Sequence, residues 1–408
     1  MKLKKKDKII EQNVLKNYKI HSPSKLPIEK LKYKKSYEKK RERLFLNALK
    51  LPQKIFDNAD LLDLGSGTGE HDLLYAKWNA NLHLVEINPI SVNQTKEYFK
   101  KNKLESKIKL IKNQSIFDFK TKKRFDIIIS EGVLHHTNAP FQGLEKIAKL
   151  IKRGGFCVLQ LAFDTSHFQR SLHRLIIDYL KKKEPNLDVI NICKKLFNET
   201  INRAAKFGGR TKNQIIYDFY TNPKHKGINL EKLINFFKKN NFEYYSSYPS
   251  IEPEGFVNGL ESPLLSEIIS NYSFLSLTQN MNFVLASKED KYFIKEIQKD
   301  LIALNKLWSK LMINTSLSDY EYKNKNNFKI FKNKKEFRKF FIKYNTFLSK
   351  RNAIRQKHFK TFSQELSSLI ESLKKNNIKN IKNCIKKTKI LFKGYNGVPS
   401  NYIVFYKK

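Results

Sequence analysis

Between residues 60 and 161, two patterns of apolar positions alternate along the chain. Short apolar runs rich in Leu, Ile and Val are followed by longer stretches compatible with a helix, at residues 70–78 and 143–151. Buried-type strands that alternate with helices predict a parallel sheet with right-handed crossovers. The predicted strands lie at residues 61–64, 81–85, 108–111, 125–129 and 156–161.

The next part of the chain, residues 166–290, is richer in helical stretches. We expect helices at residues 168–181 and 230–239, and strands at residues 243–248 and 282–286. Between them lies an aromatic segment, residues 217–225, which could line an acceptor pocket or pack in a core.

The last part of the chain, residues 291–408, predicts mainly helices. Apolar residues recur at helical spacing over 293–312, and further helices are expected at 335–349 and 358–374. Residues 402–406 are strand-like and should pair with some sheet. The expected organisation is a flexible basic arm (1–34), an α/β core that starts with a basic helix (35–165), a substrate cap with the closing strands of the core (166–290), and a basic helical extension (291–408).

Positive charge is concentrated at both ends of the chain. The formal net charge is +42, of which residues 1–55 contribute +13 and residues 291–408 contribute +22. Such ends could dock RNA, because basic patches follow phosphate backbones. However, 69 of the 80 basic residues are lysine, and the chain is rich in Asn and Ile. This bias is also typical of an AT-rich coding sequence, so both interpretations stay open.

The remaining composition excludes several classes of protein. The three cysteines share no CxxC spacing, so we expect no metal site and no disulfide framework. No apolar run reaches the roughly 18 residues that span a bilayer. The basic start has no apolar segment behind it, so it does not resemble a secretory signal. We therefore expect a cytoplasmic protein; its oligomeric state stays open.

The chemistry of the chain is concentrated where strands end. The first predicted strand breaks into Gly65-Ser66-Gly67-Thr68-Gly69, and a helix follows. Glycines at such a turn let the backbone approach a ligand closely. The second strand ends at Glu86, some twenty residues after the first glycine, where a nucleotide-binding α/β fold places a carboxylate against ribose hydroxyls.

Taken together, these segments resemble the class I S-adenosylmethionine-dependent methyltransferases. The run LLDLGSGTGEHDLLYA is similar to their first motif and LHLVEINP to their acidic second motif. The segments FDIIISEGVLHHTNAP and IKRGGFCVLQLA are similar to the later part of the fold in the broad type 11/12 branch. The resemblance covers roughly residues 40–165 and implies a seven-stranded Rossmann-like core, for which residues 282–286 resemble the closing strand. The pattern GSGTG differs from the dinucleotide pattern GxGxxG, which argues against NAD.

The resemblance also implies roles for individual residues. Asp63 would orient the turn and lie near the amino group of the methionine part, and Glu86 would bind the ribose with Ile87 against the adenine. Gln114 stands where the family often has an acidic residue for the adenine amino group, so Ser115 and Ile116 could contribute instead. The implied cofactor-binding set is Asp63, Gly65, Ser66, Gly67, Gly69, Glu86, Ile87, Gln114, Ser115, Ile116, Glu131 and Gly132.

The methyl acceptor is less constrained by the sequence. His135 and His136 follow the fourth strand, where either imidazole could take a proton from an acceptor, or could simply pack in the fold. No Asn/Asp-Pro-Pro-Tyr/Phe tetrad follows that strand, which disfavours methylation of exocyclic base amines. Our leading hypothesis is methyl transfer to an O or N atom of a small metabolite or glycan-type acceptor. RNA methylation is the alternative, and a non-catalytic binding module is the third hypothesis.

Overall fold

The fold was analysed in a computed structural model. It describes residues 3–21, 31–165, 168–208, 210–251, 268–269, 272, 298–321, 334–349, 353–375, 378–389, 391–392 and 401–408. None of the helices in these ranges is both long and apolar enough to cross a membrane.

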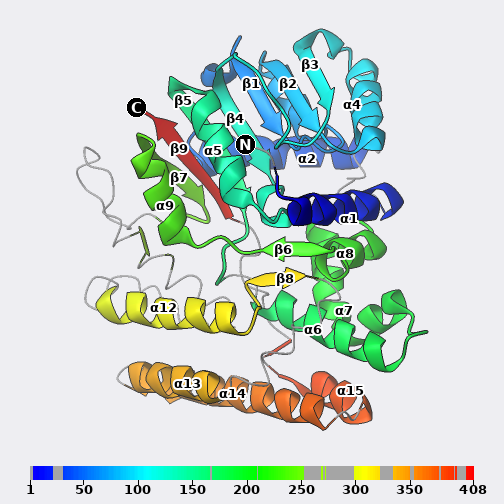
Figure 1. The fold of residues 1–408 in the computed structure, drawn as a ribbon, viewed down its shortest axis with the longest axis vertical. Helices are drawn as coiled ribbons and strands as arrows, with labels where there is room; N and C mark the ends of the chain where they lie inside the picture. Colours follow the sequence, from blue (N-terminus) through cyan, green and yellow to red (C-terminus); the bar gives the residue numbers. More distant parts are fainter. Residues whose placement is uncertain are drawn as a thin grey trace.

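A seven-stranded mixed sheet forms the upper part of the molecule (Figure 1). Its order is β3-β2-β1-β4-β5-β9-β7, and β1 to β5 pair in parallel as predicted. The Rossmann-like core that we expected is therefore confirmed. The strands are β1 (Asp60–Leu64), β2 (Asn81–Glu86), β3 (Ile108–Asn113), β4 (Phe125–Glu131), β5 (Ile151–Leu161), β7 (Phe242–Tyr248) and β9 (Asn401–Lys407).

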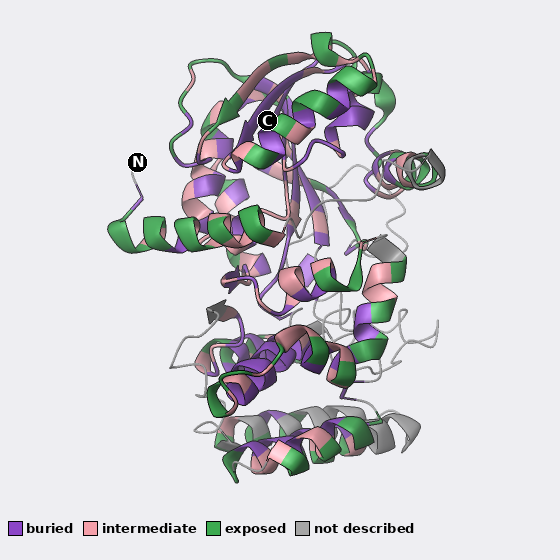
Figure 2. Cartoon of the chain, turned by 90° about the vertical axis from the view of Figure 1, so that its right-hand side faces the viewer, coloured by how far each residue is buried: buried purple, intermediate pink, exposed green. Residues whose placement is uncertain are grey.

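Helices cover both faces of this sheet. Side chains of β1, β2 and β4 alternate between two apolar cores: Leu62 and Ile128 belong to one, and Leu61 and Ile127 to the other. This alternation follows from the period of two along a strand, and Figure 2 shows the strands as mostly buried. The helices are α2 (Leu31–Arg43), α3 (Asp72–Lys77), α4 (Pro89–Lys101), α5 (Pro140–Leu150) and α9 (Leu230–Lys239).

The end of the chain supplies an inner strand of the sheet. β9 runs antiparallel between β5 and β7, with Val404 paired to Val158 on one side and to Ser246 on the other. The strand predicted at residues 402–406 is confirmed, and it belongs to the core domain. Our expected closing strand, residues 282–286, lies outside the described residues, and β9 occupies the position next to β5.

The basic arm expected at residues 1–34 is a helix over much of its length. Residues Lys5–His21 form α1, which crosses below the sheet at the ends of its strands (Figure 1). Our expectation of a flexible arm was wrong for this segment, because the many lysines obscured a small apolar face. Leu3 and Ile10 are buried, and Val14 and Leu15 face a cavity.

The lower half of the molecule is a layer of helices with one shared core. This core joins residues of the predicted cap, such as Leu172 and Tyr220, to residues of the extension, such as Trp308 and Leu366. The cap and the extension, which we expected as separate units, therefore pack as one body. Its elements are α6 (Phe168–Lys183), α7 (Val189–Gly208), α8 (Lys212–Phe219), α12 (Gln298–Asn314), α13 (Lys334–Ser349), α14 (Ala353–Lys374), α15 (Ile378–Lys387) and the small sheet of β6 (Lys224–Lys226) with β8 (Asp319–Glu321).

Candidate functional site

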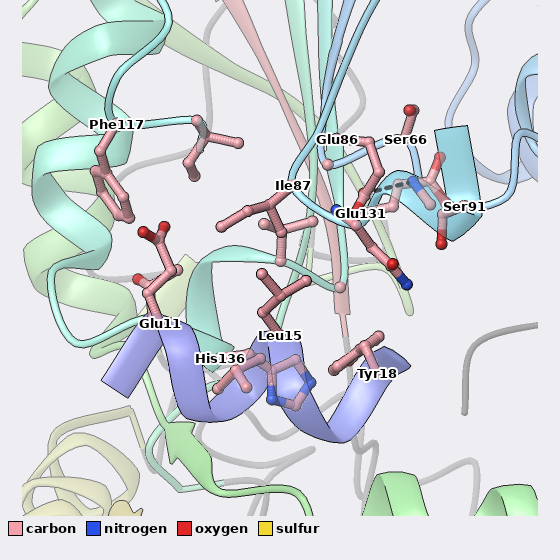
Figure 3. A pocket seen from close by; sticks show the side chains of 18 of the residues that line it. Glu11, Leu15, Tyr18, Ser66, Glu86, Ile87, Ser91, Phe117, Glu131 and His136 are labelled. Carbon is pink, nitrogen blue, oxygen red and sulfur yellow. Dashed lines mark hydrogen bonds between the residues drawn. The ribbon is translucent and has the colours of Figure 1, made fainter. Parts of the chain in front are cut away.

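A cavity lies at the carboxyl ends of β1, β2 and β4 (Figure 3). Open α/β sheets bind ligands at this edge, where loops leave the strands. Most of the residues predicted for a binding site line it, namely Gly65, Ser66, Gly67, Glu86, Ile87, Ile116, Glu131, Gly132 and His136. The other predicted residues, Asp63, Gly69, Gln114, Ser115 and His135, lie outside the lining.

The turn after β1 requires glycine at two positions, because a side chain at each would collide with a different neighbouring residue. Gly65 has φ +93°, and a Cβ there would lie 2.3 Å from Val133 Cγ2. Gly69 has φ +76°, and a Cβ there would lie 2.6 Å from Thr95 Cγ2. Positive φ and these short approaches both exclude a side chain. Gly69 therefore packs against Thr95 on the side of the turn away from the cavity, while Gly65 and Gly67 line the cavity.

Glu86 holds the glycine turn against the end of β2. Its carboxylate accepts the backbone N–H of Gly67 at 2.9 Å and that of Asn88 at 2.8 Å. Burial raises the pKa of this carboxyl group, and the two N–H donors oppose that shift. Each carboxylate oxygen can accept more than one hydrogen bond. Glu86 can therefore hold the turn and still accept two hydroxyl groups from a ligand.

Glu131, at the end of β4, is fixed by a buried network. Arg41 from α2 donates to both of its oxygens at 2.7 Å, and Tyr75 and Tyr402 each donate at 2.8 Å. Burial alone would raise the pKa of Glu131, but Arg41, His71 and the hydroxyl of Tyr402 lower it to about 2. Glu131 is therefore ionised and oriented at neutral pH. Sequence analysis missed Arg41, Tyr75 and Tyr402, since they come from three distant segments.

Asp63 lies behind the turn, beside Asp72. Burial, together with the charges of Asp72 and Glu131, raises the pKa of Asp63 well above its usual range. Burial also raises the pKa of Asp72 to about 7. Both shifts favour the protonated forms of this buried pair. Its predicted contact with the methionine amino group stays a prediction.

Apolar side chains line the other end of the cavity, where the carboxylate of Glu11 also lies. Ile116 and Phe117 line this end with Ile87. The backbone N–H of Gln114 donates to the carbonyl of Glu86 at 3.0 Å, so Gln114 continues the strand edge. Ser115 donates through Oγ to Glu11 of α1 at 2.5 Å. The resemblance had implied Gln114, Ser115 and Ile116 as adenine contacts, whereas Phe117 was missed; of these, Ile116 and Phe117 line the cavity.

Helix α1 forms the outer wall of this cavity. Glu11 and Leu15 point from α1 toward the core, as Figure 3 shows. Glu11 is bonded to Ser115, and Asp7 accepts a hydrogen bond from Asn138. At its other end, the ring of His21 stacks on Tyr217 of α8 with centroids 3.5 Å apart. The helix therefore connects the core with the lower half across the mouth of the cavity.

The two histidines after β4 have different surroundings. His136 lines the cavity, and its Nδ1 lies 2.8 Å from the carbonyl oxygen of Lys224. Burial lowers the pKa of His136, so its imidazole is neutral at pH 7 and Nδ1 is the protonated nitrogen. His135 is buried behind it, with ring centroids 4.3 Å apart. Of the two, His136 is the one that reaches the cavity.

Several lining residues had no signal that we recognised in the sequence. Those of the N-terminal segment were hidden by its lysine content, and most of the others lie inside the recognised motifs at positions to which the resemblance assigned no role. They are Leu3, Asp7, Glu11, Val14, Leu15, Tyr18, Thr68, Glu70, His71, Asn88, Ser91, Phe117, Val133, Thr137 and Asn138.

Comparisons with known proteins agree with this geometry. Residues 55–188 match the model of a family described as "Methyltransferase domain". No curated protein matches the sequence.

Three solved structures are similar to parts of this chain. PKMT2 from Rickettsia typhi, in complex with AdoHcy, has 17% identity and a TM-score of 0.41 over 51% of this chain and 43% of its own. The magnesium protoporphyrin IX methyltransferase (ChlM) from Synechocystis PCC 6803, with bound SAM, has 15% identity and a TM-score of 0.27 over 31% of this chain and 59% of its own. A putative sarcosine dimethylglycine methyltransferase from Galdieria sulphuraria has 14% identity and a TM-score of 0.33 over 68% of this chain and 84% of its own. This chain spans less than two thirds of the first two structures.

The family match covers the part of the chain that builds β1 to β5, the glycine turn and Glu86. The parallel strands, the turn and the carboxylate are the features that the sequence motifs predicted. Residues 55–188 therefore form a class I S-adenosylmethionine-dependent methyltransferase domain, and its cofactor is S-adenosylmethionine.

Proposed function

We propose that this chain transfers a methyl group from S-adenosylmethionine to an O or N atom of a small metabolite or glycan-type acceptor. The observation that carries this proposal is the position of α1. The helix lies across the cavity and is fastened to the core through Glu11 and to the lower half through His21. A small acceptor fits the space left beneath α1 better than a folded polymer does.

The cofactor would lie along the cavity from the apolar end to Glu131. We propose that Glu86 accepts the ribose hydroxyls and that Ile87, Ile116 and Phe117 pack around the adenine. Backbone groups of the glycine turn would face the methionine part, and Gly132 would lie near the methyl group. The hydrogen bond between Glu86 and Gly67 supports this placement, because it joins the carboxylate to the turn.

The acceptor would lie between the methyl group and His136. In the transfer, the acceptor atom forms a bond to the methyl carbon while the bond from that carbon to sulfur breaks. The electron pair of the broken bond stays on sulfur, which gives S-adenosylhomocysteine, and the proton of the acceptor O–H or N–H group passes to solvent. Holding both partners in line can supply much of the rate. We propose that His136, rather than His135, is the histidine nearer to the reacting acceptor atom, since His136 lines the cavity.

RNA remains the alternative acceptor because of the basic ends. Stacking on bases needs accessible aromatic rings. In the extension, Phe340 and Phe362 are buried in the helical core, which favours the small acceptor.

Methyl-labelled S-adenosylmethionine and the full chain, incubated with a cell extract, test the proposal. We expect label in the small-molecule fraction, and less of it with Glu86→Ala at a cofactor concentration near the wild-type Kd. Label in RNA that ribonuclease removes would contradict the small-acceptor proposal.

Replacing Glu86 by alanine should weaken binding of S-adenosylmethionine. The loss of a charged hydrogen-bond acceptor costs about 1–3 kcal/mol, which is roughly a 5- to 150-fold rise in Kd. Calorimetric titration of both proteins measures this change. Glu97→Ala, at an exposed position of α4, is the matched control and should bind as the wild type does. Equal affinity in Glu86→Ala would show that the ribose is bound elsewhere.

A further inference from the structure

Three histidines meet beside the cofactor cavity. His135 and His136 belong to a 3₁₀ turn, Leu134–His136, and His225 belongs to β6, far away in the sequence. One ring nitrogen of each lies within 4.8 Å of the others. His135 and His225 are buried, while His136 borders the cavity. The described residues thus bring together three imidazoles that sequence analysis had not connected.

The strand that carries His225 is held firmly in place. β6 pairs with β8, with His225 opposite Tyr320. The segment after β6 joins the core, since Ile228 bridges to Phe163 and its N–H donates to the carbonyl of Ala162 at 2.9 Å. The side chain of Lys224 forms an ion pair with Asp319 of β8. These contacts fix the backbone of β6 against the histidine turn.

The hydrogen bond between His136 and the carbonyl oxygen of Lys224 resembles the bond that orients a metal-bound histidine in known metal sites. A histidine that binds a metal usually donates its other ring N–H to a carbonyl or carboxylate, which orients the ring. Nδ1 of His136 makes this contact with the carbonyl oxygen of Lys224. Nε2 of His136 is then the nitrogen that can bind an ion.

We propose that His135, His136 and His225 bind one Zn²⁺ ion, whose fourth position opens to the cofactor cavity. Three imidazoles with one open position form a known type of catalytic zinc site. Zn–N bonds of about 2.0–2.1 Å place tetrahedral nitrogens roughly 3.3 Å apart. The ring nitrogens that lie within 4.8 Å of one another must therefore approach by at most about 1.5 Å to bind one ion.

The charges around the cluster favour an anionic fourth ligand. The charged groups of Asp218, Arg170 and Arg174 all lie near the His136 ring. Asp218 is itself paired with Arg210 at 2.7 Å. Positive charge therefore exceeds negative charge on this side of the histidines.

This inference rests on the proposed function and narrows it to an oxygen acceptor. Zn²⁺ lowers the pKa of bound water to about 7, and it acts on a bound hydroxyl in the same direction. The hydroxyl proton would pass to solvent, and the resulting oxygen anion would attack the methyl carbon. The bond from that carbon to sulfur then breaks, and its electron pair stays on sulfur.

Cobalt binding to the full chain tests the site. The purified protein is treated with a chelator, dialysed, and titrated with Co²⁺, whose visible absorption reports tetrahedral coordination. We expect one Co²⁺ per chain, displaced by one Zn²⁺. His225→Ala should weaken binding by at least the 10- to 100-fold that outer-shell changes cause. His83→Gln, at a histidine of β2 outside both the cluster and the cavity lining, is the matched control and should bind as the wild type does.

Titration of the same samples with S-adenosylmethionine separates the two proposals. His225 does not line the cofactor cavity, so His225→Ala should keep the cofactor affinity of the wild type. Intact cofactor binding without Co²⁺ binding in the wild type would overturn the zinc site alone. Equal Co²⁺ binding in the wild type and His225→Ala would also overturn it. Should His225→Ala fail to fold, His225→Gln gives the same comparison with a smaller change of volume.

Discussion

A chain that lacks residues 401–408 should lose most of its stability. The deletion removes β9 from between β5 and β7 and leaves both strands with unpaired edges. It also removes the buried side chains of Ile403, Val404 and Phe405. Burial of one such side chain contributes about 1.5–3 kcal/mol, so the loss approaches the 5–15 kcal/mol of a whole domain.

Denaturant unfolding of point variants also tests the contribution of β9 to stability, in chains that still fold. Phe405 is buried and stacks on Phe237 with centroids 4.0 Å apart, so Phe405→Ala should cost about 3–5 kcal/mol. Lys408→Ala, at the exposed end of the chain, should change the free energy of unfolding by no more than about 0.5 kcal/mol. A truncated chain that unfolds at the same temperature as the full chain would refute the role of β9.

Arg41→Met should be the most damaging single change near the site. The side chains of Arg41 and Glu131 are only 4% and 3% exposed. Removing one partner of a buried ion pair leaves an uncompensated charge, which costs about 3–5 kcal/mol. Glu131 also borders the cavity, so binding of S-adenosylmethionine should weaken as well. Denaturant unfolding and calorimetric titration measure the two effects.

Two further variants isolate the charge from the packing. Arg43→Met, on the exposed side of the same helix, should behave as the wild type does. Glu131→Gln added to Arg41→Met should recover a large part of the lost stability, because the buried charge is then gone. Absence of any recovery would mean that packing, and not charge, explains the loss.

The stability from this pair also depends on pH. The pKa of Glu131 falls from 4.5 to about 2 on folding, so its stabilisation is complete above about pH 4.5. It is lost as the pH falls toward 2. The difference between the wild type and Arg41→Met should therefore shrink in acid.

The parts of the site that local sequence encodes were predictable. The glycine turn and Glu86 follow from one strand–turn–helix unit and the next strand, so their spacing carried the information. The five parallel strands followed from the same alternation of patterns. Each of these features needs only residues that are close together along the chain.

Features that depend on distant pairings were not predictable in this way. The network of Glu131 joins Arg41, Tyr75 and Tyr402, and the histidine cluster joins a turn to a strand some ninety residues later. Helix α1 was missed for a different reason. Its lysines gave it the composition of a solvated arm, while a narrow apolar face docks it on the cavity.

Calorimetric titration of the full chain with S-adenosylmethionine tests the central claim most directly. We predict one binding site per chain, with a dissociation constant in the range of about 1 μM to 1 mM that is typical of enzyme substrates. S-Adenosylhomocysteine should compete for this site, and NAD should not. No binding of S-adenosylmethionine at several times that range, or displacement of it by NAD, would contradict the assignment of this cavity.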